Sequence, residues 1–72
     1  MRKLKLVAKR DFEVIRNNKV ICKIEKDKEY MASYYEDTEE FFINENENEI
    51  LVAELLDNKI KVDEDFKLIE SL

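Results

Sequence analysis

The chain has 72 residues and a mass of 8.7 kDa, a size that predicts one domain over residues 1–72 with a small core. Hydrophobic residues form 44% of the chain, which excludes a disordered protein although charged residues form 43%. No apolar run approaches the ~20 residues of a membrane helix, and the start lacks the apolar region of a secretory signal. We therefore expect a folded protein with no membrane partner.

Several residue types that carry chemistry are absent. The chain has no histidine, glycine or proline, and Cys22 is its single cysteine. This composition removes the usual general base, the commonest metal ligand and the glycine-rich phosphate loop. We expect no enzyme activity, no cofactor and no metal site. One cysteine without an export signal fits a reducing, cytoplasmic setting.

The net charge of −5 is distributed unevenly. Residues 1–28 contain ten Lys/Arg and four Asp/Glu, whereas residues 29–58 contain ten Asp/Glu and no Lys or Arg. Such segments either fold against each other or present an acidic surface to a partner. Because the overall charge opposes binding to phosphate, we do not expect direct contact with nucleic acid.

The first third of the chain shows the period-two alternation of strands with one buried face. The residues on the inward phase are Leu4, Leu6, Ala8, Val20, Cys22 and Ile24. Asn17-Asn18 lies between two apolar segments, and asparagine tolerates the positive φ of a tight turn, so we predict a hairpin there. Cys22 is then a small buried hydrophobe with an inert thiol.

Two aromatic pairs flank a polar turn between Tyr34-Tyr35 and Phe41-Phe42. This arrangement favours an antiparallel hairpin stabilised by cross-strand aromatic contacts. A three-residue loop, residues 37–39, pairs Tyr35 with Phe41 and Tyr34 with Phe42. Tyr35, Phe41 and Ile43 then face the core, and Tyr34 and Phe42 face outward.

The remaining segments are shorter. Residues 50–53 are predicted as a strand buried on both faces, and a helix over residues 49–57 is the alternative because its leucines lie near helical spacing. Asn58 and the preceding aspartate predict a turn, and residues 60–62 alternate again. Residues 63–66 are predicted as a short helical turn opened by an acidic cap, before a last strand.

Roughly five or six short strands with frequent turns predict an all-β small barrel. Three segments resemble the Src-homology-3 family. Residues 6–14 are similar to its opening strand and first loop, residues 24–30 to the turn into its second strand, and residues 62–69 to its single helical turn before the last strand. The resemblance implies a five- to six-stranded barrel with a short helical turn before the last strand.

The same resemblance does not extend to the family's ligand site. Proline-peptide recognition in that family uses tyrosines in the opening strand, a tryptophan after the second hairpin and a proline near the end. In this chain Lys9-Arg10 replaces the tyrosine-bearing stretch, and Phe41-Phe42 stands where the tryptophan is expected. The chain has no proline. We therefore carry over the architecture alone.

We predict a non-enzymatic protein-binding site on the outward side of the aromatic hairpin. An aromatic anchor with a charged rim is typical of a binding hot spot. Its residues are Tyr34, Phe42, Glu36, Asp37, Glu39, Glu40, Glu45 and Glu47. The acids favour a basic or nucleic-acid-binding protein as partner, through electrostatic steering.

Two other functions fit the same charge pattern. The acidic stretch could occupy the channel of a DNA- or RNA-binding protein, as phage-encoded inhibitors of the anti-defence type do. A structural homo-oligomer would instead join the acidic stretch of one copy to the basic first third of another. Its apparent mass should fall as ionic strength rises.

Overall fold

The structure is a computed structural model that describes residues 2–72. Over these residues the chain consists of eight β-strands and turns, with no helix, so the all-β prediction is confirmed. The strands are β1 (Lys3–Ala8), β2 (Phe12–Arg16), β3 (Lys19–Ile24), β4 (Glu29–Tyr35), β5 (Glu40–Glu45), β6 (Asn48–Leu56), β7 (Lys59–Val62) and β8 (Phe66–Ser71). The prediction of five or six strands was too low.

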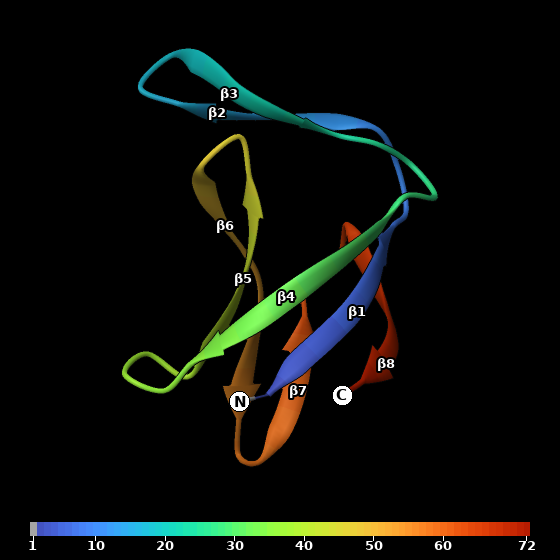
Figure 1. Ribbon diagram of the computed structural model, residues 1–72, viewed down its shortest axis with the longest axis vertical. Helices are drawn as coiled ribbons and strands as arrows, with labels where there is room; N and C mark the ends of the chain where they lie inside the picture. The colour runs from blue at the N-terminus through green and yellow to red at the C-terminus, as the bar shows by residue number, and fades with distance from the viewer. Residues whose placement is uncertain (1) are drawn as a thin grey trace.

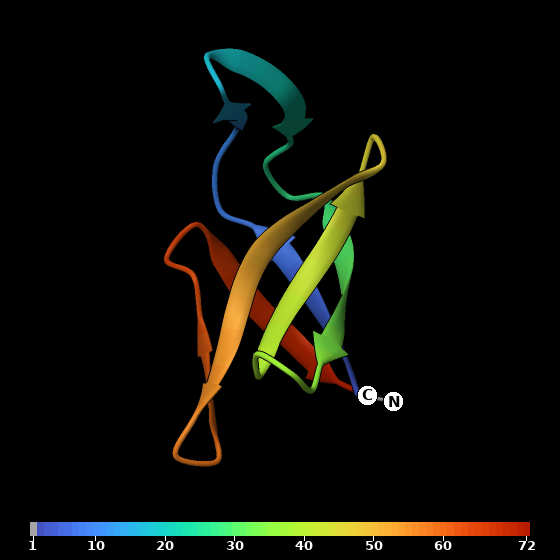
Figure 2. The ribbon, with the colours of Figure 1, turned by 90° about the vertical axis from the view of Figure 1, so that its left-hand side faces the viewer.

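Six of the strands form one sheet in the order β7-β6-β5-β4-β1-β8, and β2 and β3 form a separate hairpin. The sheet curls until its two end strands, β7 and β8, approach each other (Figure 1, Figure 2). The β2–β3 hairpin lies across one end of this nearly closed barrel, beyond the turn between β5 and β6 (Figure 1). This architecture is compatible with a Src-homology-3-like barrel.

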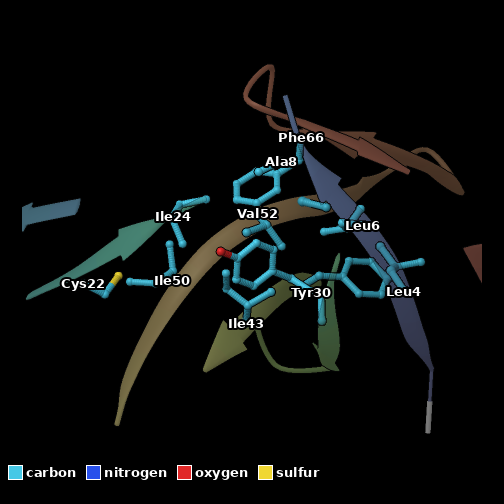
Figure 3. Packing of buried hydrophobic residues seen from close by; sticks show 13 residues of the cluster. Leu4, Leu6, Ala8, Cys22, Ile24, Tyr30, Ile43, Ile50, Val52 and Phe66 are labelled. Atoms are coloured by element: carbon cyan, nitrogen blue, oxygen red, sulfur yellow. The ribbon is translucent and has the colours of Figure 1, made fainter. Parts of the chain in front are cut away.

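Strand β1 lies between β4 and β8 and supplies one wall of the core. Leu4, Leu6 and Ala8 are buried, as their alternation predicts, and Leu4 lies opposite Ala32 while Leu6 lies opposite Tyr30. The remaining buried side chains converge on them from β3, β5, β6 and β8 (Figure 3). These residues are Cys22, Ile24, Phe41, Ile43, Ile50, Val52, Ala53 and Phe66.

The polar end of Tyr30 is satisfied inside this core. Its hydroxyl oxygen accepts a hydrogen bond from the backbone N–H of Glu25 at 3.0 Å. Buried polar groups destabilise a fold unless they are paired. Within residues 2–72, no buried side-chain nitrogen or oxygen lacks a hydrogen-bond partner.

The β2–β3 hairpin closes the core from one end. Cys22 and Ile24 pack into the core, with Cys22 beside Ile50 in Figure 3. Arg16 also donates a hydrogen bond to the Glu49 carbonyl oxygen at 3.2 Å. The hairpin prediction at Asn17-Asn18 and the burial of Cys22 are therefore confirmed.

Three hairpins turn through pairs of residues that both have positive φ: Asn17-Asn18, Asn46-Glu47 and Asp57-Asn58. This is the pattern of type I′ turns, whose twist matches that of the adjoining strands. Glycine is the residue that adopts positive φ at least cost, and this chain has none. Asparagine and aspartate tolerate the left-handed region because their short side chains bond locally, whereas Glu47 at φ 64° lacks that advantage.

The β6 segment corrects one prediction and confirms another. It is a strand and not a helix, but Leu51 is 46% exposed, so residues 50–53 are not buried on both faces. Phe41 pairs with Ala53 and Phe42 with Leu51, so Val52 is the extra residue of a bulge. A bulge shifts the inward phase by one residue. Val52 and Ala53 are consequently both buried.

The helical turn predicted before the last strand is not seen. Residues 63–66 form a tight turn closed by a hydrogen bond from the Phe66 N–H to the Asp63 carbonyl at 3.0 Å. The Asp63 carboxylate accepts a second bond from the Asp65 N–H at 2.9 Å. This local bond from an aspartate side chain stabilises a turn in competition with a helix.

We expect Glu47→Gly to raise the free energy of unfolding by about 1 kcal/mol, because glycine adopts positive φ without the steric cost that Glu47 carries. Glu47→Ala is the matched control, since it removes the same charge and keeps the Cβ. Urea unfolding followed by far-UV circular dichroism compares the three proteins. Equal stabilisation by both substitutions would assign the effect to charge and contradict the backbone explanation.

Candidate functional site

The register between β4 and β5 decides which aromatic rings face outward. Tyr34 lies opposite Phe41, and Tyr35 lies opposite Glu40. The connection between the strands is four residues long, 36–39, and Glu39 has φ 57°. The predicted loop of three residues is therefore one residue too short. The predicted strand pairing is displaced by one residue along β4. A one-residue slip moves every side chain of a strand to the opposite face.

The consequence is that Tyr34 packs against the core while Tyr35 stands outside. The Tyr34 ring contacts the fully buried Phe41 with centroids 4.9 Å apart, and Arg2 lies 5.6 Å from the centroid of the Tyr34 ring. Tyr35 is 39% exposed, and its ring lies 4.9 Å from that of Phe42. The outward aromatic pair is Tyr35 and Phe42, in place of the predicted Tyr34 and Phe42.

Leu51 extends this pair into a patch over three strands. Phe42 lies opposite Ser33 on one side and opposite Leu51 on the other. We call the surface made by Tyr35, Phe42 and Leu51, with Glu40, Glu49 and Glu54 around them, the outer β4–β6 face. In other proteins, large exposed apolar patches with a polar rim occur at interaction sites.

A hydrogen bond fixes the ring of Tyr35 on this face. Its hydroxyl donates to a carboxylate oxygen of Glu49. This bond raises the pKa of the Tyr35 hydroxyl, because the bond requires the proton; partial desolvation and the nearby negative charge act in the same direction. The bond thereby holds the ring beside Phe42.

The acids of the outer β4–β6 face form no ion pair within residues 2–72, although Lys61 on β7 lies opposite Glu54. Glu40 lies directly opposite Glu54, and like charges in that position repel each other. Among residues 2–72, the ion pairs join Lys5 to Glu29 and Glu70, Arg10 to Asp65, and Lys28 to Glu25. None of these pairs involves a carboxylate of the outer β4–β6 face.

A shallow hollow adjoins the patch at Leu51. Its volume is about 390 Å³, and it lies between β6 and β7. Its lining residues are Leu51, Val52, Ala53, Glu54, Lys61, Val62, Asp63 and Glu64.

The predicted site residues do not form one surface. Phe42 and Glu40 lie on the outer β4–β6 face. The acids at 36, 37 and 39 occupy the loop between β4 and β5, whereas Glu45 and Glu47 lie at the far end of β5. Five strand residues, 40–44, at about 3.3 Å each lie between Glu39 and Glu45. Glu45 also borders a different hollow, shared with residues of β3, so it faces the β2–β3 hairpin.

Four residues of the outer β4–β6 face were missed by sequence reasoning, and one of them, Tyr35, was placed in the core by the wrong register. Glu49 and Glu54 belong to the acidic stretch but carry no local signal that sets them apart from its other acids. Leu51 was placed inside because its neighbours form an unbroken apolar run. Leu51 faces outward by ordinary alternation, because it lies between the buried Ile50 and Val52. The bulge at Val52 changes the phase after it and turns Glu54 outward, which depends on pairing with β5.

The rest of the described chain offers little chemistry. No group of three or more Asp, Glu or Cys side chains is placed to hold a metal ion in residues 2–72. Cys22 is buried, and burial raises the pKa of its thiol. Over the same residues there is no helix with the length and apolar character needed to span a membrane.

Comparison of the chain with protein-family models, with curated proteins and with solved structures gives no match.

The Tyr35–Glu49 bond predicts a pH dependence. The folded state holds the Tyr35 proton more tightly than the unfolded chain does, so the bond stabilises the fold below a pH of about 10 and is lost as the pH rises through the raised pKa. Glu49→Gln keeps an acceptor and removes the charge, and we expect it to move the Tyr35 pKa down towards its ordinary value. Titration of ¹³Cζ-labelled tyrosine by NMR measures the pKa, with Tyr35→Phe assigning the resonance. The same Tyr35 pKa in both proteins would contradict the interaction.

Proposed function

We propose that this protein is a non-enzymatic binding module that recognises another protein through its outer β4–β6 face. The observation that carries the proposal is the contiguous surface of Tyr35, Phe42 and Leu51 among three carboxylates without ion-pair partners. Rigid aromatic side chains in the centre of a polar rim are the usual anchors of protein interfaces. The bond between Tyr35 and Glu49 supports the proposal because it orders an exposed ring in advance.

The chemistry of the face defines the partner. Its apolar centre calls for aliphatic or aromatic side chains, and its unpaired acids call for Lys or Arg beside them. The absence of Lys and Arg from residues 29–58 means that no cation of the same stretch competes for these carboxylates. Opposite charges also raise the rate of encounter at low ionic strength. We therefore expect the segment of the partner that contacts this face to contain apolar residues flanked by Lys or Arg.

We infer that the barrel belongs to the Src-homology-3-like type but does not use that family's ligand residues. The β2–β3 hairpin follows the first strand, where the family has its long first loop. The chain has no tryptophan and no proline, and its opening strand has no tyrosine, so the residues that bind proline peptides in the family are absent. A site on the outer surface of β4, β5 and β6 therefore stands apart from the family's ligand site.

The alternative of a nucleic-acid-mimic inhibitor receives less support. Mimicry needs acids spaced along one surface in the manner of phosphates, and phosphate contacts dominate such recognition. In this fold the acids of the β4–β5 loop and those near the β5–β6 turn lie at opposite ends of β5, with apolar side chains between them. An apolar centre favours a protein segment over a channel that binds phosphates.

Selection from a displayed library of random dodecapeptides tests the proposal. We expect the immobilised protein to enrich sequences in which Lys or Arg adjoins Ile, Leu, Val or an aromatic residue. Leu51→Lys adds a cation to the centre of the face and should lower capture of the enriched peptides at least tenfold. Ile69→Glu, at a comparably exposed position on β8 (48% against 46%), is the matched control and should retain capture.

Enrichment of acidic peptides would contradict the proposal, and so would capture of the enriched peptides by Leu51→Lys at the wild-type level. Far-UV circular dichroism of each variant confirms that the barrel is intact before binding is compared. Because both substitutions lie at exposed positions on strands, we expect each to change the free energy of unfolding by about 0.5 kcal/mol or less.

A further inference from the structure

We infer that the outer β4–β6 face binds the tip of the β2–β3 hairpin of a second copy of this chain, so that molecules associate head to tail. The inference rests on the proposed function and names a partner for the same face. The partner segment defined above is apolar and flanked by basic residues. One segment of the chain itself has that character and is exposed.

The segment is the tip of the β2–β3 hairpin. Ile15 and Val20 lie directly opposite each other and are 64% and 49% exposed, and Ile15 is the most exposed of the large hydrophobic residues in the described chain. The next pair is Arg16 opposite Lys19, two like charges. Lys23 lies further along β3. Lys23 lies on the same side as Ile15 and Val20 but opposite Glu13 of β2, and Arg16 bonds to its own molecule. The tip thus presents two apolar side chains with the exposed Lys19 and Lys23 beside them.

A bulge explains why this apolar pair faces outward. Val14 pairs with the buried Cys22, and the next pair is Ile15 with Val20, which leaves Ile21 as an extra residue on β3. The alternation therefore sends Val14 and Cys22 towards the core and Ile15 and Val20 to the opposite side of the hairpin. The predicted inward position of Val20 is wrong for this reason.

The tip cannot reach the outer β4–β6 face of its own molecule. The core-facing side of the hairpin is already attached to the β5–β6 turn, through Arg16 on the Glu49 carbonyl at 3.2 Å and Asn48 on the Ile21 carbonyl at 3.5 Å. Ile15 and Val20 are consequently exposed on the other side of the hairpin, although Val20 also borders the hollow that Glu45 and Asn46 line. The hairpin forms one extremity of the molecule (Figure 1). The face and the tip can meet only between two copies.

The two surfaces are complementary in charge and in character. The face provides Tyr35, Phe42 and Leu51 with acids around them, and the tip provides Ile15 and Val20 with Lys19 and Lys23 beside them. The contact is heterologous, since each copy uses a different surface, and it leaves one free tip and one free face for further copies. Association of this kind also buries apolar surface that a domain of this size otherwise exposes.

Sedimentation velocity of the purified protein at increasing concentration, in 50 mM and 500 mM salt, tests the contact. We expect species heavier than 8.7 kDa that dissociate at the higher salt, because screening weakens charge pairs at the rim. Ile15→Glu disables every tip and Leu51→Lys disables every face. Each variant alone should have an association constant at least tenfold lower than that of the wild type. It should therefore sediment as a monomer at concentrations where the wild type associates. Ile69→Glu should associate as the wild type does.

The decisive sample is the equimolar mixture of Ile15→Glu and Leu51→Lys. The first has an intact face and the second an intact tip, so the mixture should form a species of two chains that grows no further. Loss of association in Leu51→Lys but not in Ile15→Glu would indicate a symmetric contact between faces and overturn the inference. A mixture that stays monomeric, or a wild type that is monomeric at all concentrations, would overturn it as well. A monomeric wild type that still selects basic, apolar peptides would leave the proposed function standing.

Discussion

Tyr34 and Phe41 lie directly opposite each other on β4 and β5, with ring centroids 4.9 Å apart, and Phe41 is fully buried. The side on which this pair lies fixes which side chains of β4 and β5 face the core. With Tyr34 inside, Tyr35 must face outward, beside Phe42, because successive side chains of a strand alternate between faces. The outer β4–β6 face exists only in this register, and a slip of one residue on β4 would bury Tyr35 and expose Tyr34.

The strand β4 shows why this register could not be read from the sequence. Its inward residues are Tyr30, Ala32 and Tyr34, and its outward residues include Met31 and Tyr35, so both phases are largely apolar. Local periodicity cannot choose between them. The choice is made by pairing with β1, where the leucines alternate cleanly with lysines and leave one inward phase. Long-range pairing therefore determines the candidate site.

Other elements were predictable to the extent that their cause is local. The Asn17-Asn18 turn followed from the tolerance of asparagine for positive φ, and the burial of Leu4 and Leu6 followed from alternation. The position of Val20 could not be predicted, because it depends on a bulge formed against β2. The bulge at Val52 likewise sets the outward position of Glu54 through pairing with β5. Leu51 itself alternates regularly between the buried Ile50 and Val52, and the unbroken apolar run of residues 50–53 hides that alternation in the sequence.

The fold also determines which charges remain available. The ion pairs of the basic first third join Lys5 to Glu29 and Glu70, Arg10 to Asp65, and Lys28 to Glu25. The carboxylates of the outer β4–β6 face take part in none of these pairs. Glu54 lies between Glu40 on one side and Lys61 on the other. A partner that brings cations to this surface removes a repulsion that the isolated molecule retains. Burial of an apolar centre supplies the attraction, and the unpaired acids select which apolar surfaces are accepted, since an acidic partner would add to the repulsion.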